Sequence, residues 1–195
     1  MIPEDDAALY RPRYNIAPSN TSWVLQPGGD DRVLVPAVWG YVVRDRPLIN
    51  VRGEQVMSGA GFREAFANRR CLMVTDGFYE WNGAKRPTWF HRQDDGLVLL
   101  AGLFQRSDGR SRFTVLTTRP NRRVAGIHNR MPVIVSAEAV DGWLIGSTSE
   151  AARLIEPAPE EYLVATAVSA RVNSVRHDDP ECLAPPEPDR QSSLF

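Results

Sequence analysis

The sequence predicts a single domain of the α+β class, built on a curved, mostly antiparallel, barrel-like β-sheet with flanking helices. A length of 195 residues is enough for one well-buried domain and too short for two ordinary ones. Most apolar segments are short and rich in valine, leucine and aromatic residues, which is typical of strands. Segments with helical spacing are few and brief, and this balance favours the α+β class.

The predicted strands are the runs of β-branched, leucine and aromatic residues that glycine and proline separate along the chain. They cover residues 33–43, 71–74, 97–104, 112–117 and 162–168. The chain shows no internal repeat.

Three segments have helical character. Residues 62–70 place Phe62, Ala65 and Phe66 on one face, and 137–144 and 149–155 are predicted as two further short helices. Ser136 and Ser149 stand at the starts of the last two, where a serine can cap a helix. Pro3, followed by three acidic residues, predicts the first turn of another helix at the N-terminus.

The composition is that of a soluble cytoplasmic protein. Hydrophobic residues make up 43% and charged residues 24%, and no apolar run approaches the length of a membrane span. The acidic N-terminus lacks the basic and apolar regions of a signal peptide. Only Cys71 and Cys182 occur, far apart, which argues against a disulfide scaffold and fits a reducing cytoplasm.

The basic residues are distributed unevenly along the chain. Residues 11–147 carry a net charge of +7 and the remainder −8, and Lys85 is the only lysine among 23 basic residues. Arginine offers a planar fork suited to phosphate, so the middle of the chain is compatible with nucleic-acid binding. A high-GC genome would produce the same arginine bias, and the charge alone does not decide between these interpretations.

The last twelve residues differ from the rest of the sequence. From Ala184 the chain is proline-rich and shows no periodicity, which predicts a domain over residues 1–183 and a flexible tail over 184–195. The tail ends in Gln191, two serines, Leu194 and Phe195. This ending resembles the short peptides with which bacterial proteins dock on the replication sliding clamp, where the apolar pair would fill a pocket. The alternative is a plain disordered terminus.

Several sequence blocks occur in a recognisable order. They are RPRYNIAPSN (11–20), VWGYV (38–42), INVRGE (49–54), RCLMVTDGFYEW (70–81), AGLF (101–104), TVLTT (114–118), IHNRMPVIV (127–135) and VSARVNSVRHDDPECL (168–183). Together they resemble the SRAP family (SOS-response-associated peptidase, also called abasic-site-processing proteins), over nearly the whole chain.

The resemblance implies a role in the DNA damage response, in which an abasic site in single-stranded DNA is captured as a DNA–protein crosslink. Family members carry a cysteine directly after the initiator methionine. Its amine condenses with the abasic aldehyde to a Schiff base, and its thiol closes a thiazolidine ring. Lyase-like activity and removal of the protein's own first methionine, the peptidase step, belong to the same expectation.

The resemblance also assigns site residues. Asn50 matches the asparagine that holds the N-terminal residue or the sugar, Glu80 the carboxylate that moves protons, and His128 the histidine that acts on the deoxyribose oxygen. The resemblance further implies DNA contacts by the residues Trp39, Arg52 and Arg130. Without these blocks, Glu80 would be interpreted as a surface residue and His128 as a loop or core histidine, and a core tryptophan and a structural ion pair would explain Trp39 and Arg52.

No cofactor or metal is expected. The histidines His91 and His177 and the two cysteines show no ligand spacing. Cys71 lies in an apolar strand, where a free cysteine is usually inert packing, so it is not predicted to replace the family's nucleophile. No Ser-His-Asp or Cys-His set points to a peptidase acting on other proteins.

Residue 2 departs from the family pattern, because it is Ile2 rather than cysteine. Either a first strand bearing Met-Cys-Gly-Arg is missing from the sequence, or the chain is a variant that has lost the nucleophile. In both cases residue 2 cannot form a thiazolidine, and crosslinking is expected to be impaired. A non-covalent module that binds single-stranded or damaged DNA is the alternative function, and autoprocessing peptidase activity is the second alternative.

Overall fold

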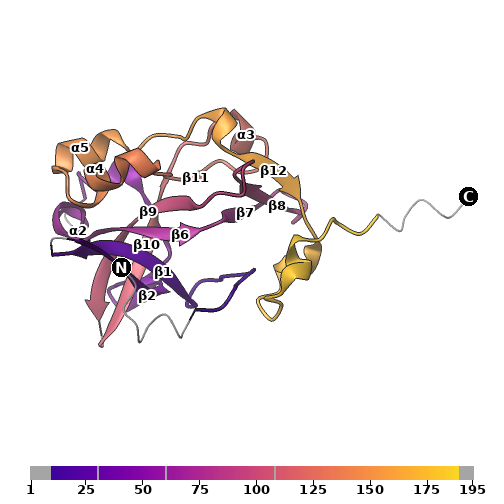
Figure 1. The fold of residues 1–195 in the computed structure, drawn as a ribbon, viewed down its shortest axis with the longest axis horizontal. Helices are drawn as coiled ribbons and strands as arrows, with labels where there is room; N and C mark the ends of the chain where they lie inside the picture. Colours follow the sequence, from indigo (N-terminus) through magenta and orange to yellow (C-terminus); the bar gives the residue numbers. More distant parts are fainter. Residues whose placement is uncertain (1–9, 30, 60, 108, 189–195) are drawn as a thin grey trace, which may run out of the picture.

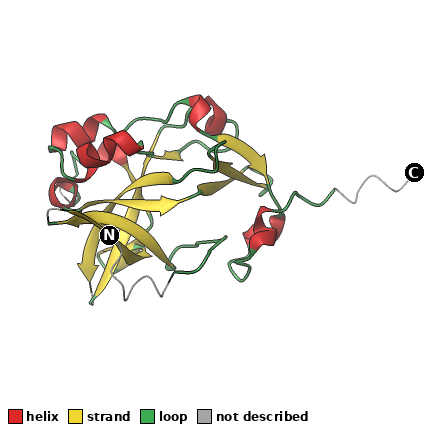
Figure 2. Cartoon of the chain, in the orientation of Figure 1, coloured by secondary structure: helices red, strands yellow, loops and turns green. Residues whose placement is uncertain are grey.

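The computed structural model describes residues 10–29, 31–59, 61–107 and 109–188. Within these ranges, five strands close a barrel in the order β10-β2-β1-β6-β9 and back to β10 (Figures 1 and 2). The strands are β1 (Thr21–Gly28), β2 (Asp31–Trp39), β6 (Arg70–Thr75), β9 (Val98–Ser107) and β10 (Arg110–Thr118). Neighbours in the barrel are antiparallel except β2 and β10, which pair in parallel. The predicted α+β domain with a mostly antiparallel, barrel-like sheet is confirmed.

One end of β10 gathers two short strands that are distant in sequence. β5 (Asn50–Arg52) pairs with it in parallel, and β11 (Met131–Pro132) pairs with it antiparallel. Both registers meet at Thr117, which is opposite Arg52 on one side and Pro132 on the other. The blocks that contain Asn50 and His128 therefore lie at the same end of the barrel.

A second, smaller sheet extends from that end. It consists of β7 (Gly77–Trp81), β8 (Pro87–His91) and β12 (Val164–Ala167), with β8 in the middle. β7 follows β6 after a single intervening residue, Asp76, so the barrel leads directly into this sheet. The β7–β8 turn is closed by Asn82, whose side-chain oxygen accepts the backbone N–H groups of Ala84 and Arg86 at 3.0 Å each.

Helices cover one side of the barrel (Figures 1 and 2). α2 (Arg63–Asn68), α4 (Val140–Leu144) and α5 (Thr148–Arg153) pack there, and Phe66 meets Trp143 edge-on with ring centroids 5.9 Å apart. A second apolar cluster includes Val24, Met73, Leu100 and Val115 on the barrel strands. The remaining elements are α3 (Arg122–Ala125), the hairpin β3 (Tyr41–Val43) and β4 (Arg46–Leu48), and the 3-10 turns η1 (Gly53–Gln55), η2 (Ala137–Ala139), η3 (Glu160–Tyr162), η4 (Ala170–Asn173) and η5 (Pro180–Leu183).

Two predicted elements end earlier than expected. The helix predicted over 62–70 stops at Asn68, because Arg70 already belongs to β6 and its buried guanidinium donates to the carbonyls of Trp143 and Gly146. The strand predicted over 33–43 breaks at Gly40, whose φ of 147° is open to glycine and disfavoured for other residues. Both breaks depend on contacts or conformations that hydrophobic spacing does not encode.

Of the two predicted helix caps, Ser149 was wrong, and Ser136 occupies the N-cap position without a capping bond. Ser147, not Ser149, caps α5, and its hydroxyl accepts the Glu150 N–H at 3.2 Å. Ser136 stands before η2 without a side-chain capping bond. The strand predicted over 162–168 is shorter than expected, because β12 spans Val164–Ala167 and Tyr162 belongs to η3.

Three other predictions fall partly or wholly outside the described residues. These are the predicted first helical turn after Pro3, the portion of the predicted tail beyond residue 188, and the predicted docking peptide with Gln191, Leu194 and Phe195. Within the described ranges, no helix combines the length and apolar character needed to cross a membrane.

Candidate functional site

A cavity of about 410 Å³ opens where the barrel meets the smaller sheet. Its apolar inner wall comes from the barrel and includes Met73, Leu100 and Val115. Aromatic side chains and a few polar groups complete the lining, among them Trp39, Asn50, Phe78, Tyr79 and Glu80. An apolar cavity with few polar groups is the usual form of a small-ligand site, because apolar surface supplies affinity and the polar groups fix orientation.

Two of the predicted residues reach the cavity from β2 and β5, which both pair with β10. Trp39 ends β2, and its indole N–H donates to the carbonyl of Ile49 at 2.8 Å. The ring also stacks on Phe113 with a centroid separation of 6.5 Å and an interplanar angle of 14°. Asn50 follows Ile49 and begins β5, where it is exposed and opposite Val115. The Trp39 hydrogen bond therefore connects β2 to the residue before Asn50.

Glu80 is a carboxyl group in the cavity lining whose pKa is shifted toward neutrality. Its side chain is 19% exposed, and burial raises its pKa to about 7, although the nearby His128 acts in the opposite direction. The Glu80 Oε2 atom lies 3.4 Å from His128 Nδ1. A carboxyl group with a pKa near neutrality is able both to donate and to accept a proton under physiological conditions.

His128 is held by the loop that follows α3. Asn121 caps that helix by accepting the Val124 N–H at 3.0 Å, and the backbone N–H of His128 donates to the Val124 carbonyl at 2.9 Å. The imidazole is 42% exposed and lies beside Glu80 rather than in the lining of the cavity. The structure thus brings Trp39, Asn50 and Glu80 together at one cavity and places His128 next to them through Glu80.

The two predicted DNA-contacting arginines lie outside the cavity lining. Arg52 is exposed on β5, two residues after Asn50, where it pairs with Thr117 in the sheet. Arg130 forms a two-pronged ion pair with Glu54, at 2.9 and 2.8 Å. Contact of either arginine with DNA stays a prediction.

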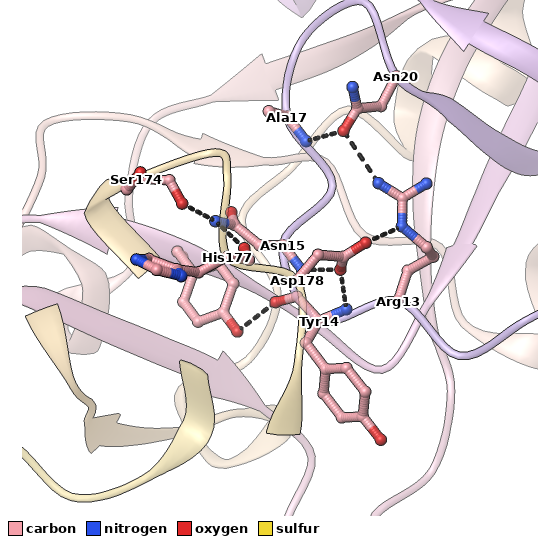
Figure 3. Close-up of polar contacts among 9 residues, drawn as sticks. Arg13, Tyr14, Asn15, Ala17, Asn20, Ser174, His177 and Asp178 are labelled. Carbon is pink, nitrogen blue, oxygen red and sulfur yellow. Dashed lines mark hydrogen bonds and ion pairs between the residues drawn. The ribbon is translucent and has the colours of Figure 1, made fainter. Parts of the chain in front are cut away.

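A polar network that sequence reasoning did not identify forms another wall of the cavity (Figure 3). Asp178 accepts the backbone N–H groups of Tyr14 and Asn15 at 2.7 and 2.9 Å and pairs with the Arg13 guanidinium. The Asn15 amide donates to the carbonyls of residues 172, 174 and 177 at 3.1, 3.2 and 3.0 Å. These bonds fasten the segment 13–18 to the segment 172–183, and both segments line the cavity.

The network also connects to the smaller sheet. The hydroxyl of Tyr79, the residue before Glu80, donates to the carbonyl of Tyr14 at 2.7 Å. Arg13 donates in addition to the Asn20 side chain at 3.0 Å. The signal in the sequence was the presence of RPRYNIAPSN and VRHDD among the distinctive blocks, but nothing in either block indicates that the two meet across more than 160 positions.

The interior position of Cys71 is confirmed, because the side chain is fully buried in the barrel. Burial raises the pKa of its thiol far above the ordinary value, which removes the reactive thiolate. Among the described residues, no group of three or more His, Cys, Asp or Glu side chains is placed to hold a metal ion.

Because the pKa of Glu80 is raised, the stability of the fold should depend on pH. The folded state holds the Glu80 proton more tightly than the unfolded state, so the free energy of unfolding falls as pH rises from about 4.5 to about 7. We expect Glu80→Gln to be more stable than the wild type at pH above 7, by at most on the order of 3 kcal/mol, and equal to it below pH 4.5. Urea unfolding at the two extremes measures this, with the exposed Glu161→Gln as control. If the two proteins differed in free energy of unfolding by the same amount at both pH extremes, ionisation of a desolvated Glu80 would not be the cause.

Fold and site together define a single-domain barrel protein with a carboxylate–imidazole pair beside an aromatic cavity. The family model of the SOS response associated peptidase (SRAP) matches residues 2–175, and the chain belongs to the SRAP family. The family resemblance stated from the sequence is thereby confirmed.

Several relatives carry the name abasic site processing protein. YoqW of Bacillus subtilis is 29% identical over 202 residues, covering 94% of this chain and 89% of the relative. HMCES of Gallus gallus is 32% identical, covering 91% of this chain and 67% of the relative. YedK of Escherichia coli is 30% identical over 142 residues, covering 68% of this chain and 64% of the relative. Their shared name gives abasic-site processing as the role associated with the family.

Solved structures share the fold. A crystal structure of a protein from Bacteroides thetaiotaomicron superposes with a TM-score of 0.72 at 22% identity, covering 86% of this chain and 82% of that chain. A crystal structure of a protein from Bordetella bronchiseptica gives a TM-score of 0.71 at 25% identity, covering 79% and 86%.

Proposed function

We propose that this chain processes abasic sites in single-stranded DNA and that the cavity beside Glu80 receives the abasic sugar. The observation that carries the proposal is the Glu80–His128 pair, 3.4 Å apart, at the edge of a cavity that Trp39 and Asn50 also line. The names of the relatives support the choice of substrate. The cavity volume of about 410 Å³ is in the range of small-ligand sites, and this also favours an unstacked sugar as the occupant.

The chemistry follows from the open-chain form of an abasic sugar, which carries an aldehyde. An amine adds to the aldehyde carbon, the resulting carbinolamine loses water, and an imine forms. Each step moves one proton, and Glu80, with a pKa of about 7, is suited to give and take it. His128 acts on a deoxyribose oxygen as the sugar ring opens, with Nε2 able to accept the proton of a hydroxyl group, and Asn50 holds the sugar by hydrogen bonds.

Ile2 limits what this sequence does after the imine forms. The family mechanism uses a thiol on residue 2 to close a thiazolidine, and isoleucine offers no thiol. We therefore propose that the chain forms a reversible imine and that stable crosslinking is impaired. The alternative, non-covalent binding of single-stranded or damaged DNA, is favoured by the same observation and would show as affinity without any imine. The peptidase alternative is confined to autoprocessing at Met1, which Ile2 hinders.

A denaturing gel tests the covalent part. The chain is incubated with single-stranded DNA that carries one abasic site, beside a version that begins with Met-Cys-Gly-Arg. We expect a stable adduct with the Met-Cys-Gly-Arg version alone, and an adduct with the present chain only after borohydride reduction. Lys85→Arg removes the only lysine and so separates trapping at a side-chain amine from trapping at the N-terminal amine. A stable adduct from the present chain without reduction would contradict the proposal.

Trp39 is proposed to stack on a base beside the lesion, and Arg52 to contact phosphate. We expect Trp39→Ala to weaken binding to single-stranded DNA by about tenfold to a hundredfold, since a base–aromatic stack contributes about 1–3 kcal/mol. Fluorescence anisotropy measures the change, and Trp39→Phe, which keeps an aromatic face, should recover most of it. Trp23→Ala, which removes a tryptophan outside the cavity lining, serves as the control. If a folded Trp39→Ala protein bound single-stranded DNA with unchanged affinity, Trp39 would have only a packing role and would not stack on a base.

Docking on a sliding clamp through Gln191, Leu194 and Phe195 stays a prediction. Deletion of residues 191–195 should abolish binding of the chain to the clamp, and an intact chain that does not bind would end the hypothesis.

A further inference from the structure

Arg130 connects three elements near the proposed site. Its guanidinium forks onto both carboxylate oxygens of Glu54 at 2.9 and 2.8 Å and also donates to the main-chain carbonyl of Thr117. Glu54 lies in η1 after β5, Thr117 lies on β10, and Arg130 directly precedes β11. The hydrogen bond from Arg130 holds the pKa of Glu54 below its ordinary value, so the pair stays charged at neutral pH.

The ring of His128 is oriented by the main chain of the same arginine. His128 Nδ1 lies 3.0 Å from the Arg130 carbonyl oxygen and 3.4 Å from Glu80 Oε2. Two oxygen acceptors make Nδ1 the protonated nitrogen of the neutral ring. The backbone N–H of Arg130, 3.3 Å from Nδ1, favours the opposite tautomer, in which Nδ1 accepts a hydrogen bond. This N–H is more distant than the Arg130 carbonyl oxygen, and the Glu80 carboxylate also favours a proton on Nδ1. The protein contacts of the imidazole within the described residues are all at Nδ1, which leaves Nε2 for a substrate oxygen.

We propose that Glu54 is a positioning residue, which holds Arg130 so that its main chain fixes the His128 ring with Nε2 available to the substrate. The inference rests on the proposed function, because it explains how the ring of His128, one of the proposed site residues, is oriented. The side chain of Arg130 is 23% exposed and that of Glu54 is 50% exposed. Either residue can therefore be substituted without changing the packing of the barrel core.

The orientation is tested without DNA by ¹⁵N NMR of the histidine ring nitrogens. The measurement is made at about pH 8.5, where an ordinary histidine is neutral. We expect the wild type to show His128 protonated on Nδ1, and Glu54→Gln to shift it to a mixture of tautomers. His91 and His177 are the other two histidines of the chain and serve as internal standards of folding. Glu156→Gln, which breaks the comparable exposed Arg119–Glu156 pair at 2.9 Å, should leave His128 unchanged.

The functional consequence is measured separately, as the rate of borohydride-trapped imine on abasic DNA. We expect Glu54→Gln to lower the rate about tenfold to a hundredfold, the size expected for a misoriented catalytic group, with affinity for undamaged single strands within about twofold of the wild type. If no imine forms with the wild type, the proposed function fails while the tautomer comparison still decides the role of Glu54.

Arg130→Lys separates positioning from phosphate contact, because lysine keeps the charge but cannot fork onto a carboxylate. We expect it to shift the His128 tautomers in the same direction as Glu54→Gln. An unchanged tautomer ratio in Glu54→Gln, or weaker DNA binding by Arg130→Lys with the tautomers of His128 unaltered, would overturn the proposal.

Discussion

Replacement of Glu80 by glutamine should lower the rate of imine formation on abasic single-stranded DNA by about two to four orders of magnitude. This is the usual contribution of a general acid–base group, and glutamine keeps the shape of the side chain while removing its proton. The wild-type rate should also bend near pH 7, where Glu80 changes protonation state. In Glu80→Gln that bend should disappear. Borohydride-trapped product, measured against time between about pH 5 and 9, gives both quantities.

The matched control for this experiment is Glu161→Gln, which removes an exposed carboxylate from η3. It should leave the rate and its pH profile unchanged. A Glu80→Gln protein that keeps the wild-type rate, or loses rate while keeping the bend near pH 7, would remove Glu80 from the proton-transfer role. The expected stabilisation of the same variant at alkaline pH distinguishes loss of chemistry from loss of fold.

Replacement of Asn15 by leucine should lower the free energy of unfolding by about 3 kcal/mol, because a buried amide that serves several carbonyls is lost. Asn15 is 6% exposed and donates to the carbonyls of residues 172, 174 and 177. Leucine has a similar size, so the change removes the donors while largely preserving the volume. Urea unfolding at neutral pH measures the loss.

Asn68→Leu provides the comparison for Asn15→Leu. Asn68 is an exposed asparagine of α2 whose amide donates to Glu64 at 3.4 Å, and its substitution should change stability by less than about 0.5 kcal/mol. A loss below about 1 kcal/mol for Asn15→Leu would mean that the carbonyls are satisfied in another way and that the network does not fasten the cavity wall.

The fold class could be predicted because four of the five barrel strands, all except β1, were recognised from the local sequence. Leu97–Phe104 and Arg112–Thr117 were predicted as strands from composition, and β9 and β10 contain nearly all of both segments. β5 and β11 were not predicted, since three and two residues carry no usable periodicity and their backbones are ordered by β10. Closure of the barrel through the parallel β2–β10 pair depends on a contact between segments about seventy positions apart, which no local pattern reports.

The candidate site was predicted in part. Glu80 and His128 were singled out through their sequence blocks, and the structure brings them within 3.4 Å of each other. Sequence reasoning missed the wall built from Asn15 and Asp178, because its bonds join the two ends of the domain, more than 160 positions apart. It also missed the engagement of Arg130 by Glu54, since arginine pairs equally well with a phosphate or a carboxylate and only geometry separates the two.

Competition binding measures whether the cavity beside Glu80 recognises an abasic site, as we propose. A labelled single strand with one abasic site is displaced from the chain by the same strand unlabelled, either abasic or undamaged, and anisotropy is recorded. We expect the abasic competitor to be at least about tenfold more effective, which corresponds to about 1.4 kcal/mol of preference, and Asn50→Ala to reduce this preference. Equal competition by the two strands would show that the cavity does not recognise the abasic site and would leave it without its proposed substrate.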